Sequence, residues 1–371
     1  MEHNTRSDWS SASLAFDQWD RATLRAYERS AKMAAPCCRL WPWLRWRPSG
    51  GLLVRAGAPA PPARRLVHGD GRNVPRRAVL YVPGDDERKL RKLPTLGADC
   101  AVMDCEDGVA QNRKDVARDT VVRMLSELSL GRTEPSVRIN AVASGLADDD
   151  LRALLGGPVL PPTILLPKVD SVDDIRWFAE HFEKAVAERE LPAPINLITF
   201  VESAVGLLDL REICCAAISV GERVGLTLAG IVFGSDDFCA SIGATRTSDA
   251  RELLYARQHV VVVARALGLQ AVDMVHIDFR DPEGLARHAR DGALMGFTGK
   301  QVIHPSQVAV VQREFSPSAA RLQWASELVH AFSQHQQQGK GAFTFQGSMI
   351  DMPLLRQARN ILAMAASTSR S

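Results

Sequence analysis

Residues 163–202 decide the fold, and they read TILLPKVDSVDDIRWFAEHFEKAVAERELPAPINLITFVE. An apolar run opens this stretch at 163–169 and another closes it at 195–202, as expected for strands that are buried on both faces. Between them, residues 171–190 have the composition of a helix and begin at a serine, which is a favoured N-cap. A strand, a helix and a second strand in this order predict one unit of a parallel α/β sheet.

Similar strand–helix units fill the chain from residue 76 onward. Helix-like segments separate most of eight apolar runs, which are AVLYV (78–82), CAVMDC (100–105), SVRIN (136–140), TILLPKV (163–169), INLITFVE (195–202), GIVFGSDD (230–237), AVDMVHI (271–277) and KQVIHP (300–305). No GxGxxG or GxxxxGKS/T turn follows the first run, so we expect a (β/α)8 TIM barrel rather than a doubly wound sheet. We assign residues 75–311 to this barrel and residues 312–371 to a C-terminal helical extension that could cap its own barrel or a neighbouring one.

The first 74 residues differ in composition from the rest of the chain. From Met33 to Arg72 the sequence is rich in arginine and contains a single acidic residue, which is typical of a mitochondrial transit peptide. Residues 1–32 contain five acidic residues, so we interpret Met33 as the working start and residues 1–32 as an upstream extension. The prediction is import into the mitochondrial matrix, with residues 1–74 outside the fold. Retention in the cytosol is the alternative if translation starts at Met1.

The composition excludes several classes of protein. The 371 residues carry a net charge of +2 and are 46% hydrophobic, which suits a globular enzyme and argues against a nucleic-acid partner. No run of about 20 apolar residues is present, so no membrane span is expected. The seven cysteines form no CxxC pair and no zinc-spaced set with histidine, so we expect reduced thiols rather than disulfides or structural zinc.

Polar residues gather at the C-terminal ends of the predicted strands, which is the rim where barrel enzymes carry their chemistry. Glu202 and Asp237 end adjacent strands, and two carboxylates that converge there would suit Mg²⁺. The alternative is that they cap the following helices or pair with arginines. Arg138 could bind an anionic oxygen of a substrate, or it could form an internal ion pair with Glu106 or Asp107.

Four further residues each have two interpretations. Arg88 and Lys92 lie where a helix begins, and cations there could bind phosphates or could belong to a solvated face. His304 could be a ligand or a base, or a histidine held by ordinary hydrogen bonds. Asp351 lies between two apolar residues just before a proline, so it could shuttle a proton or could simply cap a helix.

Several ordered segments carry a family resemblance along residues 76–366. They are RRAVLYVPG, DCEDGVAQNRKDVAR, VRIN, LLPKV, FVESAVGLLDL, FGSDDF, GFTGKQVIHPSQ and GSMIDMP. In this order they closely resemble the citrate lyase β-subunit/malyl-CoA lyase family of (β/α)8 barrels. The resemblance implies a Mg²⁺-dependent carbon–carbon lyase that acts on an acyl-coenzyme A thioester. It also implies a homotrimer in which the C-terminal lid of one subunit crosses to a neighbouring subunit.

The resemblance also assigns roles to individual residues. It implies that Glu202 and Asp237 bind Mg²⁺, that Arg138 contacts the substrate and acts in catalysis, and that Asp351 is the catalytic acid/base. The residues implied to bind coenzyme A or to line the substrate site are Tyr81, Arg88, Lys92, Asp236, Ile303 and His304. Among these, Asp236 replaces the glutamate that often precedes the metal-binding aspartate, and we treat it as a neighbour of the metal.

The implied reaction is cleavage of citramalyl-CoA to acetyl-CoA and pyruvate, with malyl-CoA lyase, malate synthase and methylmalate synthase side activities. In this mechanism Mg²⁺ chelates the carboxylate and adjacent oxygen of the acyl group, Arg138 offsets the enolate charge, and Asp351 protonates the enolate. Two alternatives remain open at this point. One is a metal-dependent aldolase that acts on free hydroxy or keto acids, and the other is a non-catalytic subunit of a larger lyase complex.

Overall fold

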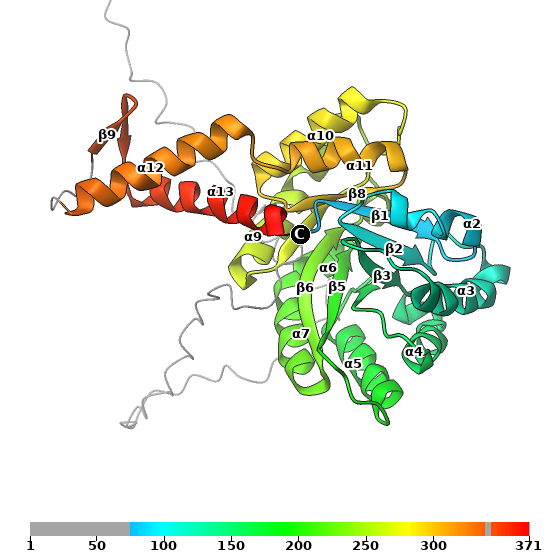
Figure 1. The fold of residues 1–371 in the computed structure, drawn as a ribbon. Helices are drawn as coiled ribbons and strands as arrows, with labels where there is room; N and C mark the ends of the chain where they lie inside the picture. Colours follow the sequence, from blue (N-terminus) through cyan, green and yellow to red (C-terminus); the bar gives the residue numbers. More distant parts are fainter. Residues whose placement is uncertain (1–74, 338–342, 371) are drawn as a thin grey trace, which may run out of the picture. The chain divides into compact units, whose positions relative to one another are not determined.

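A closed barrel of eight parallel strands forms the body of the protein, and the strands follow one another around it in chain order (Figure 1). The computed structural model describes residues 75–337 and 343–370, so the predicted transit peptide and upstream extension lie outside the described residues. The strands are β1 (Ala78–Pro83), β2 (Cys100–Asp104), β3 (Glu134–Arg138), β4 (Thr163–Leu166), β5 (Ile195–Val201), β6 (Leu226–Phe233), β7 (Gln270–Asp273) and β8 (Gly299–Val302). The predicted TIM barrel is confirmed.

Helices surround the barrel (Figure 1). They are α2 (Glu87–Leu90), α3 (Lys114–Glu127), α4 (Ala147–Gly156), α5 (Val172–Val186), α6 (Ala204–Leu208), α7 (Leu210–Val224), α8 (Ser235–Ile242), α9 (Leu254–Leu267), α10 (Pro282–Met295) and α11 (Pro305–Glu314). Short 3₁₀ turns lie at Leu93–Thr95, Gln111–Arg113, Val142–Ser144 and Arg251–Leu253. None of the helices in the described ranges is both long and apolar enough to cross a membrane.

The helix of the fold-deciding stretch begins where its sequence predicts. The Ser171 hydroxyl accepts a hydrogen bond from the Asp174 N–H at 3.3 Å, and the Asp174 carboxylate accepts one from the Ser171 N–H at 2.9 Å. This reciprocal capping satisfies two backbone donors that the first turn of a helix leaves free. Another predicted helix, DDERKLRKL, is shorter than expected: the α-helix spans only Glu87–Leu90, and a 3₁₀ turn at Leu93–Thr95, which contains Pro94, follows it.

Side chains fill the barrel interior in layers. At the N-terminal ends of the strands, the Arg76 guanidinium binds the Glu134 carboxylate at 2.5 and 2.7 Å, and the Thr163 hydroxyl donates to the same carboxylate at 2.6 Å. Arg76 and Glu134 are 3% and 8% exposed, so this ion pair closes the floor of the barrel. Above it the interior is filled by an apolar cluster of Val79, Cys100, Val102, Leu165, Ile198, Phe200, Val232 and Val272. The opposite, C-terminal end is the barrel mouth.

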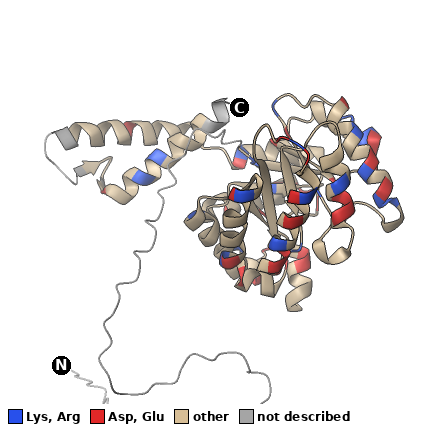
Figure 2. Ribbon diagram, turned by 90° about the horizontal axis from the view of Figure 1, so that it is seen from below, with Lys and Arg blue, Asp and Glu red and all other residues tan. Residues whose placement is uncertain are grey.

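A second and larger apolar core lies between the strands and the surrounding helices. Phe178 and Phe182 of α5 are fully buried in it, four residues apart on one helix face. Lysine and arginine are interspersed with aspartate and glutamate along the helices around the barrel (Figure 2). A surface of mixed charge agrees with the small net charge of the chain.

The C-terminal extension has a hydrophobic core of its own. It consists of α12 (Ala319–Gln337), a hairpin of β9 (Phe343–Phe345) and β10 (Ser348–Ile350), and α13 (Met352–Arg370). Gln346 and Gly347 connect the two strands with φ of 48° and 82°, as a tight hairpin turn requires. The buried residues of this core are Ala325, Leu328, Phe332, Ile350, Leu355, Ala358 and Ile361.

Candidate active site

Arg138 is held at the barrel mouth by two acidic residues. Its Nε and Nη2 donate to the two carboxylate oxygens of Asp104 at 2.7 Å each, and its Nη1 lies 2.8 Å from Oε2 of Glu106. Burial by itself would lower the pKa of Arg138, but Asp104 and Glu106 raise it above the ordinary value, so the guanidinium stays charged. The internal ion pair with Glu106 is therefore present, and Asp104 is a stronger partner that the sequence did not reveal.

Asp104 is itself fixed by the loop that follows β2. Its carboxylate accepts hydrogen bonds from the backbone N–H groups of Glu106 and Gly108, both at 2.9 Å. A Cβ atom at Gly108 would lie 2.6 Å from Oδ2 of Asp104, so only glycine permits this close approach. The loop thus orients the carboxylate that orients Arg138.

Tyr81 lies against Arg138 inside the mouth. The centroid of the Tyr81 ring is 5.1 Å from Cζ of Arg138, within range of a cation–π contact. The Tyr81 hydroxyl is buried and has no hydrogen-bond partner among the described residues. Burial raises the pKa of Tyr81 well above its ordinary value, so the hydroxyl stays protonated and can donate a hydrogen bond to a ligand in the mouth.

Glu202 follows β5 and is only 5% exposed. Its Oε2 accepts a hydrogen bond from the Lys168 N–H at 2.8 Å. Burial, together with the negative charges of Glu106 and Asp237, raises the pKa of Glu202 to about 8. A Cβ atom at Gly234, just after β6, would collide with the Glu202 carboxylate. A buried carboxylate that is surrounded by like charges is stabilised when a cation binds beside it.

Asp237 and Asp236 occupy the first turn of α8 but have different surroundings. Asp237 is exposed and lies near enough to Glu202 to act on its pKa. Asp236 forms an ion pair with Arg246 at 2.8 Å, and Arg246 also donates to the Val275 carbonyl at 2.8 Å. Asp236 is therefore engaged by an arginine, whereas the Asp237 carboxylate has no ion-pair partner within the described ranges.

The donor set fits a hard cation that keeps part of its water shell. No group of three or more His, Cys, Asp or Glu side chains in the described part of the chain is spaced to hold a metal alone. A cation bound by Glu202 and Asp237 would therefore take its remaining oxygens from water or substrate. Mg²⁺ commonly binds in this way, through one or two carboxylates.

Lys168 contacts both Glu202 and Glu106, the acid that binds Arg138. Its Nζ lies 2.6 Å from Oε1 of Glu106 and 3.1 Å from Oδ1 of Asp107. Its φ of 52° lies in the left-handed region, which costs a residue with a Cβ atom roughly 1–2 kcal/mol. In the sequence, Lys168 is one of the polar residues that follow the buried strands at the predicted barrel rim, and nothing in its residue type indicates these contacts.

Arg88 and Lys92 are exposed cations near the end of β1, four residues apart. Their neighbours are neutralised, since Lys89 lies 2.9 Å from an aspartate and Arg91 lies 2.7 Å from each of two glutamates. Arg88 and Lys92 have no acidic partner among the residues that the structure describes. They are therefore available to an external anion such as a phosphate group.

Ile303 and His304 lie at the end of β8. Ile303 is 43% exposed. The Nδ1 atom of His304 accepts a hydrogen bond from the Ser306 N–H at 3.2 Å, which caps α11, and its ring stacks on Phe279 at 4.6 Å between centroids. In this structure His304 is thus a hydrogen-bonded capping residue that supports an apolar part of the rim. Ile277, 58% exposed, adds to the apolar side chains at the end of β7.

Asp351 belongs to the C-terminal extension. Its Oδ1 accepts a hydrogen bond from the Leu354 N–H at 3.2 Å, as the cap of α13. Met349 and Met352, on either side, are 79% and 44% exposed. The structure thus brings Tyr81, Arg138, Glu202 and Asp237 together at the mouth, whereas no described interaction of Asp351 reaches them.

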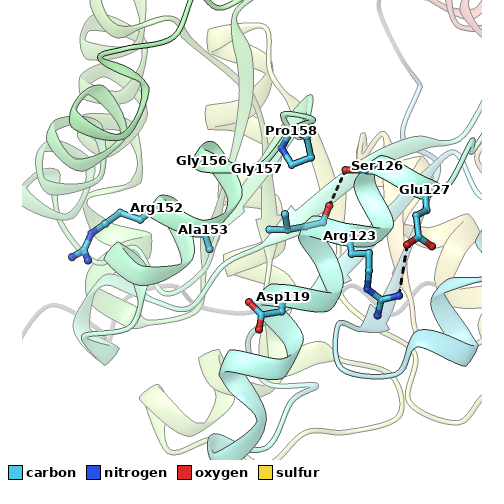
Figure 3. A pocket seen from close by; sticks show the side chains of 10 residues that line it. Asp119, Arg123, Ser126, Glu127, Arg152, Ala153, Gly156, Gly157 and Pro158 are labelled. Atoms are coloured by element: carbon cyan, nitrogen blue, oxygen red, sulfur yellow. Dashed lines mark hydrogen bonds and ion pairs between the residues drawn. The ribbon is translucent and has the colours of Figure 1, made fainter.

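A surface groove of about 670 Å³ lies between α3 and α4 (Figure 3). Its two arginines are already paired: Arg123 binds glutamates on α2 and α3 at 2.7 and 3.8 Å, and Arg152 binds Asp148. The groove therefore offers no free cation to an anionic ligand such as an acyl-coenzyme A.

Comparisons with known proteins agree with this geometry. Residues 77–305 match the family described as HpcH/HpaI aldolase/citrate lyase. The chain is 58% identical over 294 residues to "Citramalyl-CoA lyase, mitochondrial" of Homo sapiens, covering 79% of this chain and 86% of that protein. It is 33% identical over 291 residues to the (3S)-malyl-CoA thioesterase of Cereibacter sphaeroides, covering 78% of this chain and 95% of that protein.

A solved structure supports the same assignment. The CitE protein of Mycobacterium tuberculosis, in complex with magnesium, acetoacetate and coenzyme A, superimposes with a TM-score of 0.63 at 32% identity. The match covers 79% of this chain and 98% of that one. The resemblance expected from the ordered sequence motifs is confirmed, and the chain belongs to the HpcH/HpaI aldolase/citrate lyase family.

Proposed function

We propose that the protein is a Mg²⁺-dependent carbon–carbon lyase that cleaves citramalyl-CoA to acetyl-CoA and pyruvate. The 58% identity to the Homo sapiens citramalyl-CoA lyase and the magnesium and coenzyme A bound to the Mycobacterium tuberculosis relative support this proposal. In this chain the observation that carries it is the buried Glu202, whose pKa of about 8 results from burial beside further carboxylates. A cation bound beside Glu202 would compensate the negative charges that burial brings together there.

Glu202 and Asp237 are the proposed Mg²⁺ ligands. When bound there, the ion would orient the carboxylate and adjacent oxygen of the acyl group and stabilise the developing keto acid. Arg138 stays charged and faces the negative charge that develops on the thioester oxygen as the carbon–carbon bond breaks. A well-placed donor of this kind contributes roughly 3–4 kcal/mol to transition-state stabilisation. The free Tyr81 hydroxyl adds a neutral donor to the same substrate.

The coenzyme A moiety is proposed to lie along the rim of the mouth. Arg88 and Lys92 are the cations left for its phosphates, because the acidic residues nearby already bind Lys89 and Arg91. The exposed side chain of Ile303 supplies apolar surface for the uncharged arm of the thioester.

Asp351 is proposed to reach the mouth of a neighbouring subunit in a homotrimer. There it protonates the enolate carbon to give acetyl-CoA, while the proton of the substrate hydroxyl leaves to water as that oxygen becomes the carbonyl of pyruvate. Three features support this arrangement. The extension has its own core, the methionines beside Asp351 are exposed, and no described contact joins Asp351 to its own barrel mouth. Val205 and Leu208 of α6, 57% and 73% exposed, offer an apolar surface for contact between subunits.

The protein is proposed to act in the mitochondrial matrix. The arginine-rich segment from Met33 to Arg72 and the name of the Homo sapiens relative support this location. Fluorescence microscopy of the full chain, tagged at its C-terminus, should show matrix staining that is lost when residues 33–72 are removed. Cytosolic staining of the intact chain would contradict the proposed location.

The decisive experiment uses the purified protein with citramalyl-CoA and follows the release of acetyl-CoA. We expect activity with Mg²⁺, none after EDTA, and activity reduced about 100-fold or more for Asp351→Asn or Arg138→Lys alone, which makes both variants practically inactive. Mixing these two inactive variants after subunit exchange should restore about a quarter of the wild-type activity, because each site then draws Arg138 and Asp351 from different subunits. Cleavage of the free hydroxy acid at the same rate would instead favour an aldolase, and full activity of Asp351→Asn would refute the catalytic assignment.

A further inference from the structure

The link between β4 and α5 has an uncommon backbone conformation at Lys168. Its φ of 52° is disfavoured for any residue that carries a Cβ atom, and glycine or asparagine is the usual choice there. Such conformations persist where the surrounding contacts hold them, and they cluster at functional sites. At Lys168, both the backbone N–H and the side-chain ammonium group make contacts that hold this conformation.

The backbone end contacts the proposed metal ligand. The Lys168 N–H donates to Oε2 of Glu202 at 2.8 Å. This bond and the close approach of Gly234 fix the carboxylate from two sides. Because φ is the rotation about the N–Cα bond, the left-handed value sets the direction of the Lys168 side chain relative to its N–H, and with this value the two groups contact two different carboxylates.

The side-chain end contacts the acid that faces Arg138. Nζ of Lys168 lies 2.6 Å from Oε1 of Glu106, and the other oxygen of Glu106 lies 2.8 Å from Nη1 of Arg138. The Glu106 side chain is 5% exposed, so solvent screens these contacts little. A continuous chain of contacts therefore runs from Glu202 through Lys168 and Glu106 to Arg138.

We infer that Lys168 is a positioning residue, whose ammonium group anchors the left-handed turn so that its N–H holds Glu202 in place relative to Arg138. This inference rests on the proposed function, in which Glu202 binds Mg²⁺ and Arg138 binds the acyl group. Lys168 itself touches neither the metal nor the reacting atoms in this scheme. It acts on both through the groups that it holds.

The direction in which the Mg²⁺ affinity changes when Lys168 is replaced distinguishes a positioning role from a purely electrostatic effect. Lys168→Met removes a positive charge close to a cation site, and Coulomb repulsion alone predicts that Mg²⁺ then binds more tightly. Loss of positioning predicts the opposite, and residues that orient metal ligands typically contribute about 10-fold or more to metal affinity. We therefore expect titration calorimetry with MgCl₂ on the full chain to show a Kd about 10-fold higher in Lys168→Met, with kcat reduced more than KM is raised.

Two further variants make the test specific. Lys168→Arg keeps a cation that can reach the same acids, so it should restore most of the Mg²⁺ affinity, whereas Lys184→Met, which removes an exposed ion-paired lysine of α5, should change nothing. If Lys168→Met does not fold, Lys168→Gln carries the same expectation, since it also removes the ammonium group and, unlike glycine or asparagine, has no preference for the left-handed region.

The possible outcomes are distinguishable. An unchanged or lower Kd in a folded Lys168→Met protein would overturn the positioning role and leave the proposed function intact. Failure of the wild-type protein to bind Mg²⁺, or equal binding by Glu202→Gln, would overturn the proposed function and this inference with it.

Discussion

Replacing Glu202 by glutamine should make the metal-free protein more stable above neutral pH while abolishing its response to Mg²⁺. Glutamine keeps the shape of the side chain and its acceptor for the Lys168 N–H, but it cannot ionise. A carboxylate built to bind a cation destabilises the fold when the cation is absent. The two effects of the substitution therefore have opposite signs.

The magnitude follows from the pKa of Glu202, which burial raises from an ordinary 4.5 to about 8. Because the folded-state pKa is the higher one, the stabilising contribution is complete below about pH 4.5 and is lost as the pH rises through 8. Since a tenfold change in a proton-binding constant corresponds to about 1.4 kcal/mol, the wild-type protein should lose about 3 kcal/mol of unfolding free energy between about pH 5.5 and pH 8 through this group. The glutamine variant should not show this loss.

Urea unfolding of EDTA-treated protein, at one protein concentration and at both pH values, measures the difference. Addition of Mg²⁺ at about 100 times its Kd should then stabilise the wild-type protein by about 2.7 kcal/mol and the variant by nothing. Glu183→Gln, which alters an exposed glutamate of α5, is the matched control and should behave like the wild-type protein. Equal pH dependence in wild type and Glu202→Gln, or equal stabilisation by Mg²⁺, would refute the reasoning.

Three further variants, one of them a double substitution, test separate parts of the site. Arg138→Lys keeps the charge but loses the two parallel hydrogen bonds, so steady-state kinetics should show kcat reduced about 100-fold, and a smaller loss than tenfold would contradict the assigned role. The double variant Arg88→Gln with Lys92→Gln should raise KM for the thioester about tenfold with little change in kcat. Arg91→Gln, which removes an ion-paired arginine, should change neither constant. An unaltered KM in the double variant would place the phosphates elsewhere. Gly234→Ala adds a methyl group against the Glu202 carboxylate. Thermal unfolding should therefore show an unfolding free energy lower by about 1–3 kcal/mol, and calorimetry should show a weaker Mg²⁺ affinity. Wild-type values for both would contradict the close packing.

The fold could be predicted from the sequence because its main signals are local. Buried strands appear as short apolar runs, and a capped helix appears as a serine followed by an acidic residue three positions later. The boundaries were less certain where an apolar run continues beyond the sheet. The predicted strand at 271–277, for example, ends at Asp273, because the following residues leave the hydrogen-bonded ladder while Met274 remains buried.

The candidate site could be predicted only in part. Arg138, Glu202 and Asp237 were found because polar residues at the ends of buried strands need a reason to be there. The partnership of Asp104 with Arg138 was not evident, since it depends on the register of β2 and β3, which places these two residues side by side. Lys168 was also missed as a structural link, because a left-handed φ at a lysine has no signature in residue type.

The ion pair of Arg76 and Glu134 affects how reactants enter the active site and how products leave it. Since it seals one end of the barrel, every reactant must enter and every product must leave through the same opening. In the proposed arrangement the coenzyme A moiety lies along the rim, so a small keto acid released beside Glu202 and Asp237 would lie beneath it and the thioester is expected to depart first. Product-inhibition kinetics should therefore show ordered release, with acetyl-CoA preceding pyruvate, and random release would mean that a second exit opens during turnover.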